Sequence, residues 1–312
     1  MSYLLSEINK AIHSDPAKFA AACDANYAEK VASAARSIAS RRSRSRVILL
    51  SGPSGSGKTT TAMRIEDVLD HSGVETYMIS MDDYFHTVDP DTAPRTREGD
   101  YDFESPFCLD VDLLNKHFSM LDRNEKIEIP KYDFVTHSRL AGVVSQSLQL
   151  GSDEMAIFEG IHALNDVIVG KNPKAFKLYI AARSNIVDDN GTVVFRHGWM
   201  RLCRRIVRDF KYRGKGAERT LQMWDNVRRG ERLYISPYKE NADLLFDSSL
   251  ACECSVLKPY VVPLLKDVSL KEFPIVADIL EGYEQIEEMS DQYLADNSLI
   301  RKFIGGSTLD YN

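Results

Sequence analysis

The chain has 312 residues, a hydrophobic fraction of 44% and a formal net charge of -7. This size suits one large α/β domain with additions or two domains, and the acidic balance argues against general binding to nucleic acids or anionic membranes. The five cysteines show no paired CxxC spacing, which favours reduced thiols. No apolar run approaches the length that crosses a bilayer, so we expect a cytoplasmic protein without membrane or nucleic-acid partners.

Residues 1–46 are predicted to form a helical N-terminal extension. Their apolar residues recur at helix-like spacing, with a break expected at Asp15-Pro16. The extension ends in the basic run Arg41–Arg46. We interpret this run as a solvated linker rather than a nucleic-acid contact, because it is short and the chain is acidic.

From Val47 onward, short apolar runs alternate with amphipathic stretches, as in a doubly wound, mostly parallel sheet. The pattern predicts an α/β domain of the P-loop type over 47–263, with a C-terminal helical extension over 264–312. Two β-rich stretches, 126–134 and 143–150, are expected to form small hairpin additions over the ligand side. We expect five strands at 47–50, 76–81, 155–158, 176–181 and 244–246, and helices at 59–69, 111–121, 196–210, 218–233 and 273–289.

The turn after the first strand reads GPSGSGKT from Gly52 to Thr59 and fits G-x-x-x-x-G-K-[ST] at every fixed position. Glycines let the backbone turn so that successive N–H groups point at phosphate oxygens, and the following helix adds its positive dipole. Lys58 can reach the terminal phosphates, and the Thr59 hydroxyl can ligate Mg²⁺. The residues expected to bind the nucleotide are Gly52, Ser54, Gly55, Ser56, Gly57, Lys58, Thr59 and Thr60.

A phosphate-binding loop occurs in motors and GTPases as well as in kinases, so it does not define the reaction. The second strand is followed by Asp82 and Asp83. A carboxylate at this strand end faces the crevice where open α/β sheets bind ligands. Asp82 could there accept the proton of an attacking hydroxyl or help to hold Mg²⁺, which favours phosphoryl transfer.

At this point the chain resembles the uridine kinase family, which is grouped with the phosphoribulokinases. Beyond the loop and Asp82-Asp83-Tyr84-Phe85, the resemblance rests on the string from Ile129 to Arg139, on Phe158-Glu159-Gly160-Ile161-His162 and on the stretch from Arg201 to Asp209. It runs in order between Val47 and Ser249. It implies ATP as the phosphoryl donor, Mg²⁺, and a small nucleoside as the acceptor.

The resemblance also implies roles for single residues. Asp82 matches the catalytic aspartate that deprotonates the 5′-hydroxyl, and Asp102 matches the acid that binds the ribose hydroxyls. Glu159 corresponds to the acid near Mg²⁺, so Thr59, Asp82 and Glu159 are the expected metal site. The expected base contacts are Tyr132, Phe134 and His137, and the expected substrate-contacting arginines are Arg201 and Arg219. Four cationic residues are expected to act on the transferred phosphoryl group: Lys58 and, from a basic lid, Arg204, Arg205 and Arg208.

The expected activity is phosphorylation of uridine or cytidine at the 5′-hydroxyl. Two features depart from the family pattern. Known members carry Asp-His-Pro after an aromatic where this chain reads Tyr101-Asp102-Phe103, and they carry glutamine at the position of Arg219. An arginine there could meet a second anion, so a kinase for a sugar phosphate stays open, as does a non-catalytic nucleotide-binding regulator. Family members often form dimers or tetramers, and we expect a homo-oligomer.

Overall fold

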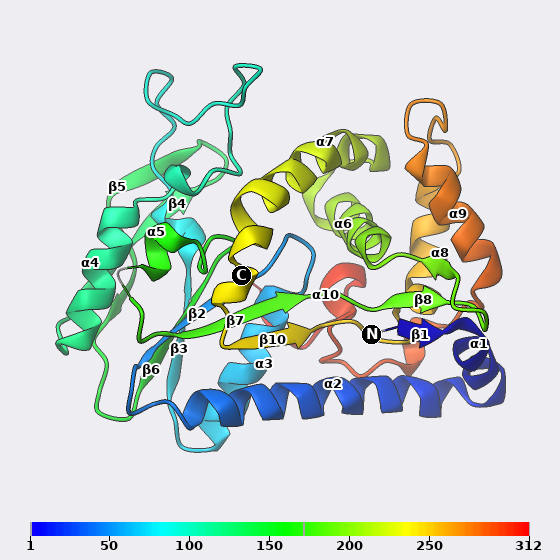
Figure 1. The fold of residues 1–312 in the computed structure, drawn as a ribbon, viewed down its shortest axis with the longest axis horizontal. Helices are drawn as coiled ribbons and strands as arrows, with labels where there is room; N and C mark the ends of the chain where they lie inside the picture. The colour runs from blue at the N-terminus through cyan, green and yellow to red at the C-terminus, as the bar shows by residue number, and fades with distance from the viewer. Residues whose placement is uncertain (1, 171, 312) are drawn as a thin grey trace.

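The protein is described by a computed structural model that covers residues 2–170 and 172–311. Its centre is a parallel sheet of five strands in the order β10-β7-β2-β6-β3 (Figure 1). Parallel strands need crossover connections, which the intervening helices supply. The strands are β2 (Val47–Ser51), β3 (Thr76–Ser80), β6 (Met155–Glu159), β7 (Phe176–Ala181) and β10 (Leu244–Asp247).

The sheet is buried on both faces, as its continuous apolar strands predict. Along β2, Ile48 and Leu50 belong to one hydrophobic cluster, and Val47 and Leu49 belong to a second. The first cluster includes side chains of α2, α3, α6, α8 and α9, and the second includes those of α4. These helices are α2 (Pro16–Ala39), α3 (Lys58–His71), α4 (Val111–Asp122), α6 (His197–Arg213), α8 (Glu253–Leu265) and α9 (Ile275–Gln285).

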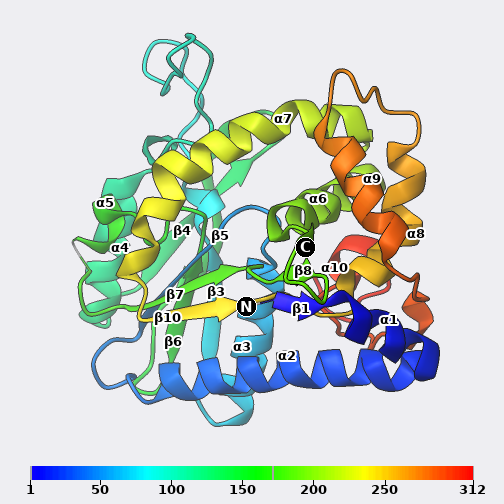
Figure 2. The same cartoon turned by 45° about the vertical axis from the view of Figure 1, so that its right-hand side comes forward.

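Smaller elements surround this layered body (Figure 2). An antiparallel hairpin joins β4 (Ile127–Asp133) to β5 (Ser138–Leu148), so the expected hairpin addition is confirmed. A second small sheet, which the sequence did not predict, has the order β1-β8-β9. It consists of β1 (Ser2–Leu4), β8 (Asn185–Val187) and β9 (Val193–Phe195). The remaining helices are α1 (Leu5–Ser14), α5 (Asp166–Val169), α7 (Ala217–Gly230) and α10 (Arg301–Ile304).

Both terminal extensions are largely helical, as expected, and α1 and α2 meet at Asp15. The Asp15 side chain accepts from the backbone N–H of Lys18 and so caps α2. The extensions share one hydrophobic cluster with the central domain: Tyr27 and Phe303 lie in the same cluster as Ile48. They are therefore built into the main core, while the boundaries at 46 and 263 stay a prediction.

The basic run Arg41–Arg46 makes contacts with neighbouring loops instead of projecting freely. Arg41 pairs with Asp243, and Arg46 donates to the carbonyls of Leu121 and Gly151. This run thus ties the end of α2 to the base of the sheet. Within the described ranges, no helix is long and apolar enough to cross a membrane.

Candidate active site

The glycine-rich loop lies between β2 and α3, at the carboxyl edge of the sheet. Gly57 has a left-handed φ of 85° and precedes α3, whose first residue is Lys58. A Cβ on Gly52 would lie 1.9 Å from the carbonyl oxygen of Ile180 in β7, so the loop can lie against that strand only with glycine there. This strand–loop–helix geometry is the context that the phosphate-binding motif requires.

A pair of charges lies where the loop faces the neighbouring strand. The Lys58 ammonium is 3.6 Å from a carboxylate oxygen of Glu159, the last residue of β6. Both side chains are largely buried, with 10% and 14% of their surfaces exposed. The cation is therefore held beside the loop, at the place where terminal phosphates bind in this motif.

Asp82 lies close to this pair, in the short 3₁₀ turn that follows β3. The turn begins after Ser80, whose hydroxyl accepts from the N–H of Asp82, and Ser80 is directly opposite Glu159 in the sheet. Asp82 is exposed to solvent at the carboxyl edge of the sheet. Desolvation there, followed by the negative charge of Glu159, raises the pKa of Asp82 to about 6, and Lys58 opposes the shift.

These residues suit a divalent cation. Magnesium in nucleotide sites is bound by one or two carboxylates and a hydroxyl, together with phosphate oxygens and water. Asp82 and Glu159 interact electrostatically, and Asp82 follows Ser80, the sheet partner of Glu159, by two residues. Thr59 is partly exposed in the first turn of α3. A cation between the two carboxylates would relieve their repulsion, so the donor set fits Mg²⁺.

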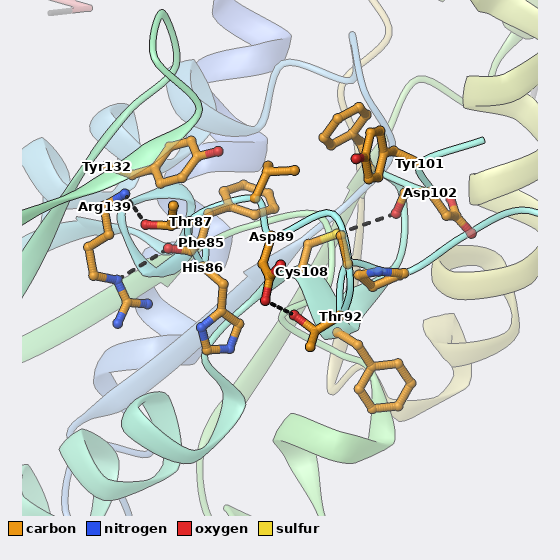
Figure 3. A pocket seen from close by; sticks show the side chains of 15 residues that line it. Phe85, His86, Thr87, Asp89, Thr92, Tyr101, Asp102, Cys108, Tyr132 and Arg139 are labelled. Carbon is orange, nitrogen blue, oxygen red and sulfur yellow. Dashed lines mark hydrogen bonds between the residues drawn. The ribbon is translucent and has the colours of Figure 1, made fainter. Parts of the chain in front are cut away.

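Beyond Asp82 the chain lines a cavity of about 550 Å³. Such a volume is typical of small-molecule sites. Figure 3 shows Tyr132 from the β4–β5 hairpin on one side and Tyr101 with Asp102 on the other. Arg139 forms part of the wall and is fixed there, because its guanidinium donates to the carbonyls of Tyr84 and Phe85 and pairs with Asp110.

The predicted base contacts lie around this hairpin. Tyr132 is 6% exposed, and its ring packs against those of Phe85 and Phe134, with centroids 5.4 and 5.0 Å away. Phe134 is more than half exposed. His137 is at the hairpin turn with a φ of 52°, and its ring stacks on that of Phe103. Of these rings, Tyr132, Phe85 and Phe103 line the cavity, whereas Phe134 and His137 pack against them and are absent from its described lining.

Asp102 lies in the cavity wall, but it is already bound by protein groups. Its carboxylate accepts from the Arg229 guanidinium and the Tyr234 hydroxyl, at 2.6 and 2.9 Å, and only 2% of the residue is exposed. A ribose diol would need to share or displace these donors. Sequence reasoning missed Arg229 and Tyr234, because more than a hundred residues separate them from Asp102 and no motif marks them.

Helix α6 supports the phosphate loop from outside with three buried arginines. Arg201 donates to the carbonyl oxygen of Ser54, and Arg205 donates to the hydroxyl of the same residue. Arg204 donates to the carbonyl oxygen of Gly55. Two of these guanidinium groups are also paired with buried acids: Arg201 with Glu231, and Arg204 with Glu253. The arginines hold the shape of the loop, because each one binds an oxygen of its backbone or side chain.

This arrangement differs from the lid expected for Arg204 and Arg205 and from the substrate contact expected for Arg201. Arg204 is completely buried between Glu253 of α8 and the ring of Phe303, so its guanidinium faces the rear of the loop. Arg219 is exposed on α7, where it contacts Gln222, and it is absent from the described lining of the acceptor cavity. Arg208 fits the expected position best: it is partly exposed, pairs with Asp209 and lines a second cavity near the loop.

Comparison with known proteins agrees with this geometry. A sequence model of the Phosphoribulokinase / Uridine kinase family matches residues 47–253. A uridine kinase of Borrelia turicatae (strain 91E135) is 30% identical over 208 residues, which are 64% of this chain and 85% of that protein. A uridine kinase of Saccharomyces cerevisiae is 28% identical over 65% of this chain, and the match covers only 36% of that longer protein.

A solved structure shares the fold. The protein named as a fructose transport system kinase from Silicibacter sp. TM1040 superposes with a TM-score of 0.50 at 17% identity, over 69% of this chain and 98% of that one. At this identity the likeness concerns the fold alone. Because the family match spans the loop, the Asp82 turn, the hairpin and α6, the chain is a phosphotransferase with a P-loop fold and belongs to the phosphoribulokinase/uridine kinase family.

Proposed function

We propose that the protein transfers the γ-phosphoryl group of ATP to the 5′-hydroxyl of a pyrimidine nucleoside, with uridine or cytidine as the acceptor. The observation that carries this proposal is the position of Asp82. It lies at the sheet edge beside Lys58 and Glu159, three residues before Phe85 in the wall of a cavity rimmed by aromatic rings. A base-sized ring offers apolar faces and polar edges, which suits such a wall.

The reaction assigned to these residues is a single displacement. Asp82 accepts the proton of the 5′-hydroxyl while that oxygen bonds to the γ-phosphorus, and the bond to the β-phosphate oxygen breaks to release ADP. Lys58 and the loop N–H groups stabilise the charge on the phosphate oxygens. Bound Mg²⁺, held by Thr59, Glu159 and Asp82, would neutralise phosphate charge and orient the donor.

The acceptor pocket is proposed on the walls of the cavity described above. Tyr132 and Phe134 would pack near the base, with His137 at the mouth, and Asp102 would bind the ribose hydroxyls together with Arg229 and Tyr234. A carboxylate already oriented by an arginine and a tyrosine is a rigid acceptor for hydroxyl donors. The placement of Arg219 away from this cavity gives it no part in the acceptor site proposed here.

An ADP-release assay tests the proposal with a panel of nucleosides and sugar phosphates, each at matched concentration. Turnover above background with uridine or cytidine, lost in Asp82→Asn, supports it. Turnover with a sugar phosphate and with no nucleoside would show that the protein is a kinase with a different acceptor. Nucleotide binding without turnover of any acceptor would instead favour a regulator.

A further inference from the structure

The C-terminal segment 299–311 returns to the phosphate loop from outside the region that matches the family. Leu299 is completely buried, and one of its methyl groups lies 2.7 Å from the position that a Cβ on Gly57 would occupy. Further along, the Thr60 hydroxyl donates to the Tyr311 hydroxyl at 3.2 Å. Both figures show α10, which lies in this segment, beneath α6 (Figures 1 and 2). The segment therefore packs against both ends of the loop–helix junction.

Between this segment and the last turns of α6 is a second cavity, of about 490 Å³. This volume is also in the range of small-molecule sites. Its walls combine apolar, aromatic and cationic side chains with the carboxyl group of Asp310 and two glycines. The lining residues from α6 are Arg208, Tyr212 and Arg213, and those from the C-terminal segment include Lys302, Leu309 and Tyr311.

The charges around this cavity are mostly positive. The Lys302 ammonium lies 4.8 Å from the centre of the Tyr311 ring, so it is held in place by a cation–π contact. It lies in the field of Glu159 and of three other cations, Lys58, Arg208 and Arg213. Burial is the main cause that lowers the pKa of Lys302 to about 8; the attraction of Glu159 opposes this shift, and the repulsion of the three cations adds to it. Cations gathered in this way favour a polyanion between them.

From these contacts we propose that the segment 299–311 forms the outer wall of the donor nucleotide site. Lys302 contacts the polyphosphate chain opposite Lys58, and the ribose and base of the nucleoside triphosphate lie in the cavity between α6 and Tyr311. This inference adds a donor-binding element to the proposed function. It rests on the proposed function for one point, that the donor is ATP. It assigns a ligand-binding role to a segment that lies beyond the family match, which ends at residue 253.

The wall also explains why Leu299 and Tyr311 are fixed to the loop itself. A wall attached to Gly57 and Thr60 keeps its distance to the phosphates constant, and a rigid support of this kind limits the loss of side-chain freedom on binding. Tyr311 thereby orients Lys302 and at the same time presents its ring to the cavity.

The test is nucleotide affinity, measured by titration calorimetry on the full chain without any acceptor. Three ligands are titrated with Mg²⁺: ATP, ADP and inorganic tripolyphosphate. The variants are Lys302→Ala, Lys302→Gln, which keeps most of the aliphatic stem, and Tyr311→Ala. Lys271→Ala is the matched control, because Lys271 is an exposed lysine of the same extension in the turn before α9. Thermal melting checks that each variant is folded.

Both Lys302 variants should weaken ATP and tripolyphosphate binding by about tenfold or more, as expected for a lost charge-assisted contact. Tyr311→Ala should weaken ATP and ADP by about threefold to tenfold and tripolyphosphate less, because its ring faces the nucleoside part. Unchanged affinity in both Lys302 variants would overturn the inference. Tighter ATP binding in Tyr311→Ala would also overturn it, since the segment would then block the site. If no nucleoside is turned over but Lys302→Gln still weakens ATP binding, the proposed function fails and the inference stands.

Discussion

The ammonium of Lys58 and the carboxylate of Glu159 lie 3.6 Å apart, although the two residues begin and end different elements of the fold. Lys58 begins α3, and Glu159 ends β6, the strand next to β2 in the sheet. The parallel register thus brings a cation and an anion to one point, where we propose that they serve the phosphates and the metal. Asp82 reaches the same point from β3, the strand on the other side of β6.

Replacement of Asp82 by asparagine should lower kcat by about 10²- to 10⁴-fold, since the hydroxyl proton then has no acceptor. ATP affinity should change little, because Lys58 and the loop hold the donor. Steady-state kinetics and calorimetry measure the two effects. Asp83→Asn is the control: Asp83 is in the same turn but pairs with Lys131. Equal loss of turnover in both variants would show that the turn matters only for structure.

The pH dependence of the rate follows from the raised pKa of Asp82, about 6. Because the carboxylate form accepts the proton, kcat/KM should rise with pH through the acidic range. Mg²⁺ between Asp82 and Glu159 lowers the pKa of Asp82, so the midpoint should lie below this metal-free value. A profile with no fall at acidic pH, at any pH where the protein stays folded, would argue against Asp82 as the base.

The pair formed by Arg204 and Glu253 should support stability rather than phosphate contact. Both side chains have no exposed surface, and Arg204 also binds the Gly55 carbonyl. Arg204→Ala leaves Glu253 buried without its partner and should lower the free energy of unfolding by about 3–5 kcal/mol, measured by urea denaturation. The double variant Arg204→Met, Glu253→Leu should recover part of this loss. If Arg204→Ala is as stable as the parent but binds ATP weakly, Arg204 contacts the phosphates, as expected for a lid residue.

A buried histidine should make stability depend on pH. The pKa of His117 is lowered to about 4, first by burial and then by the charge of Lys116, while its Nδ1 is 2.8 Å from the Tyr84 hydroxyl. The unfolded chain binds this proton near pH 6.5, so stability should fall as pH decreases from about 6.5 towards 4. Melting temperatures of the parent protein and of His117→Gln, measured over this pH range, test this expectation. The melting temperature of the variant should fall less than that of the parent as the pH decreases. If the melting temperature depends on pH equally in the parent and the variant, His117 makes no contribution to the pH dependence of stability.

Much of the fold followed from local patterns. Short apolar runs predicted all five strands of the main sheet within one residue at each end. The β-rich stretches 126–134 and 143–150 predicted hairpin additions, and in the structure they pair with each other as one hairpin. Helix α8 was not predicted: it contains Pro259 and Pro263, and its buried residues do not follow one stripe. The strands of the β1-β8-β9 sheet have three residues each, too few for a periodic signal.

The site was only partly predictable for the same reason. The loop and Asp82 follow from adjacent residues, whereas the direction in which Arg204 faces depends on Glu253 in a helix that was not predicted. Likewise, Lys302 and Tyr311 reach the loop through the packing of Leu299 against Gly57 and the hydrogen bond between Thr60 and Tyr311. No local pattern encodes such contacts, because they arise when distant segments share one core.

Phosphoryl transfer to a nucleoside is tested by identifying the products. The full chain is incubated with ATP, Mg²⁺ and uridine or cytidine, and the products are analysed by mass spectrometry with Asp82→Asn as the control. A nucleoside 5′-monophosphate should form in equal amount to ADP, and neither product should exceed background in the variant. Formation of ADP with free phosphate, and no phosphorylated nucleoside, would contradict this transfer.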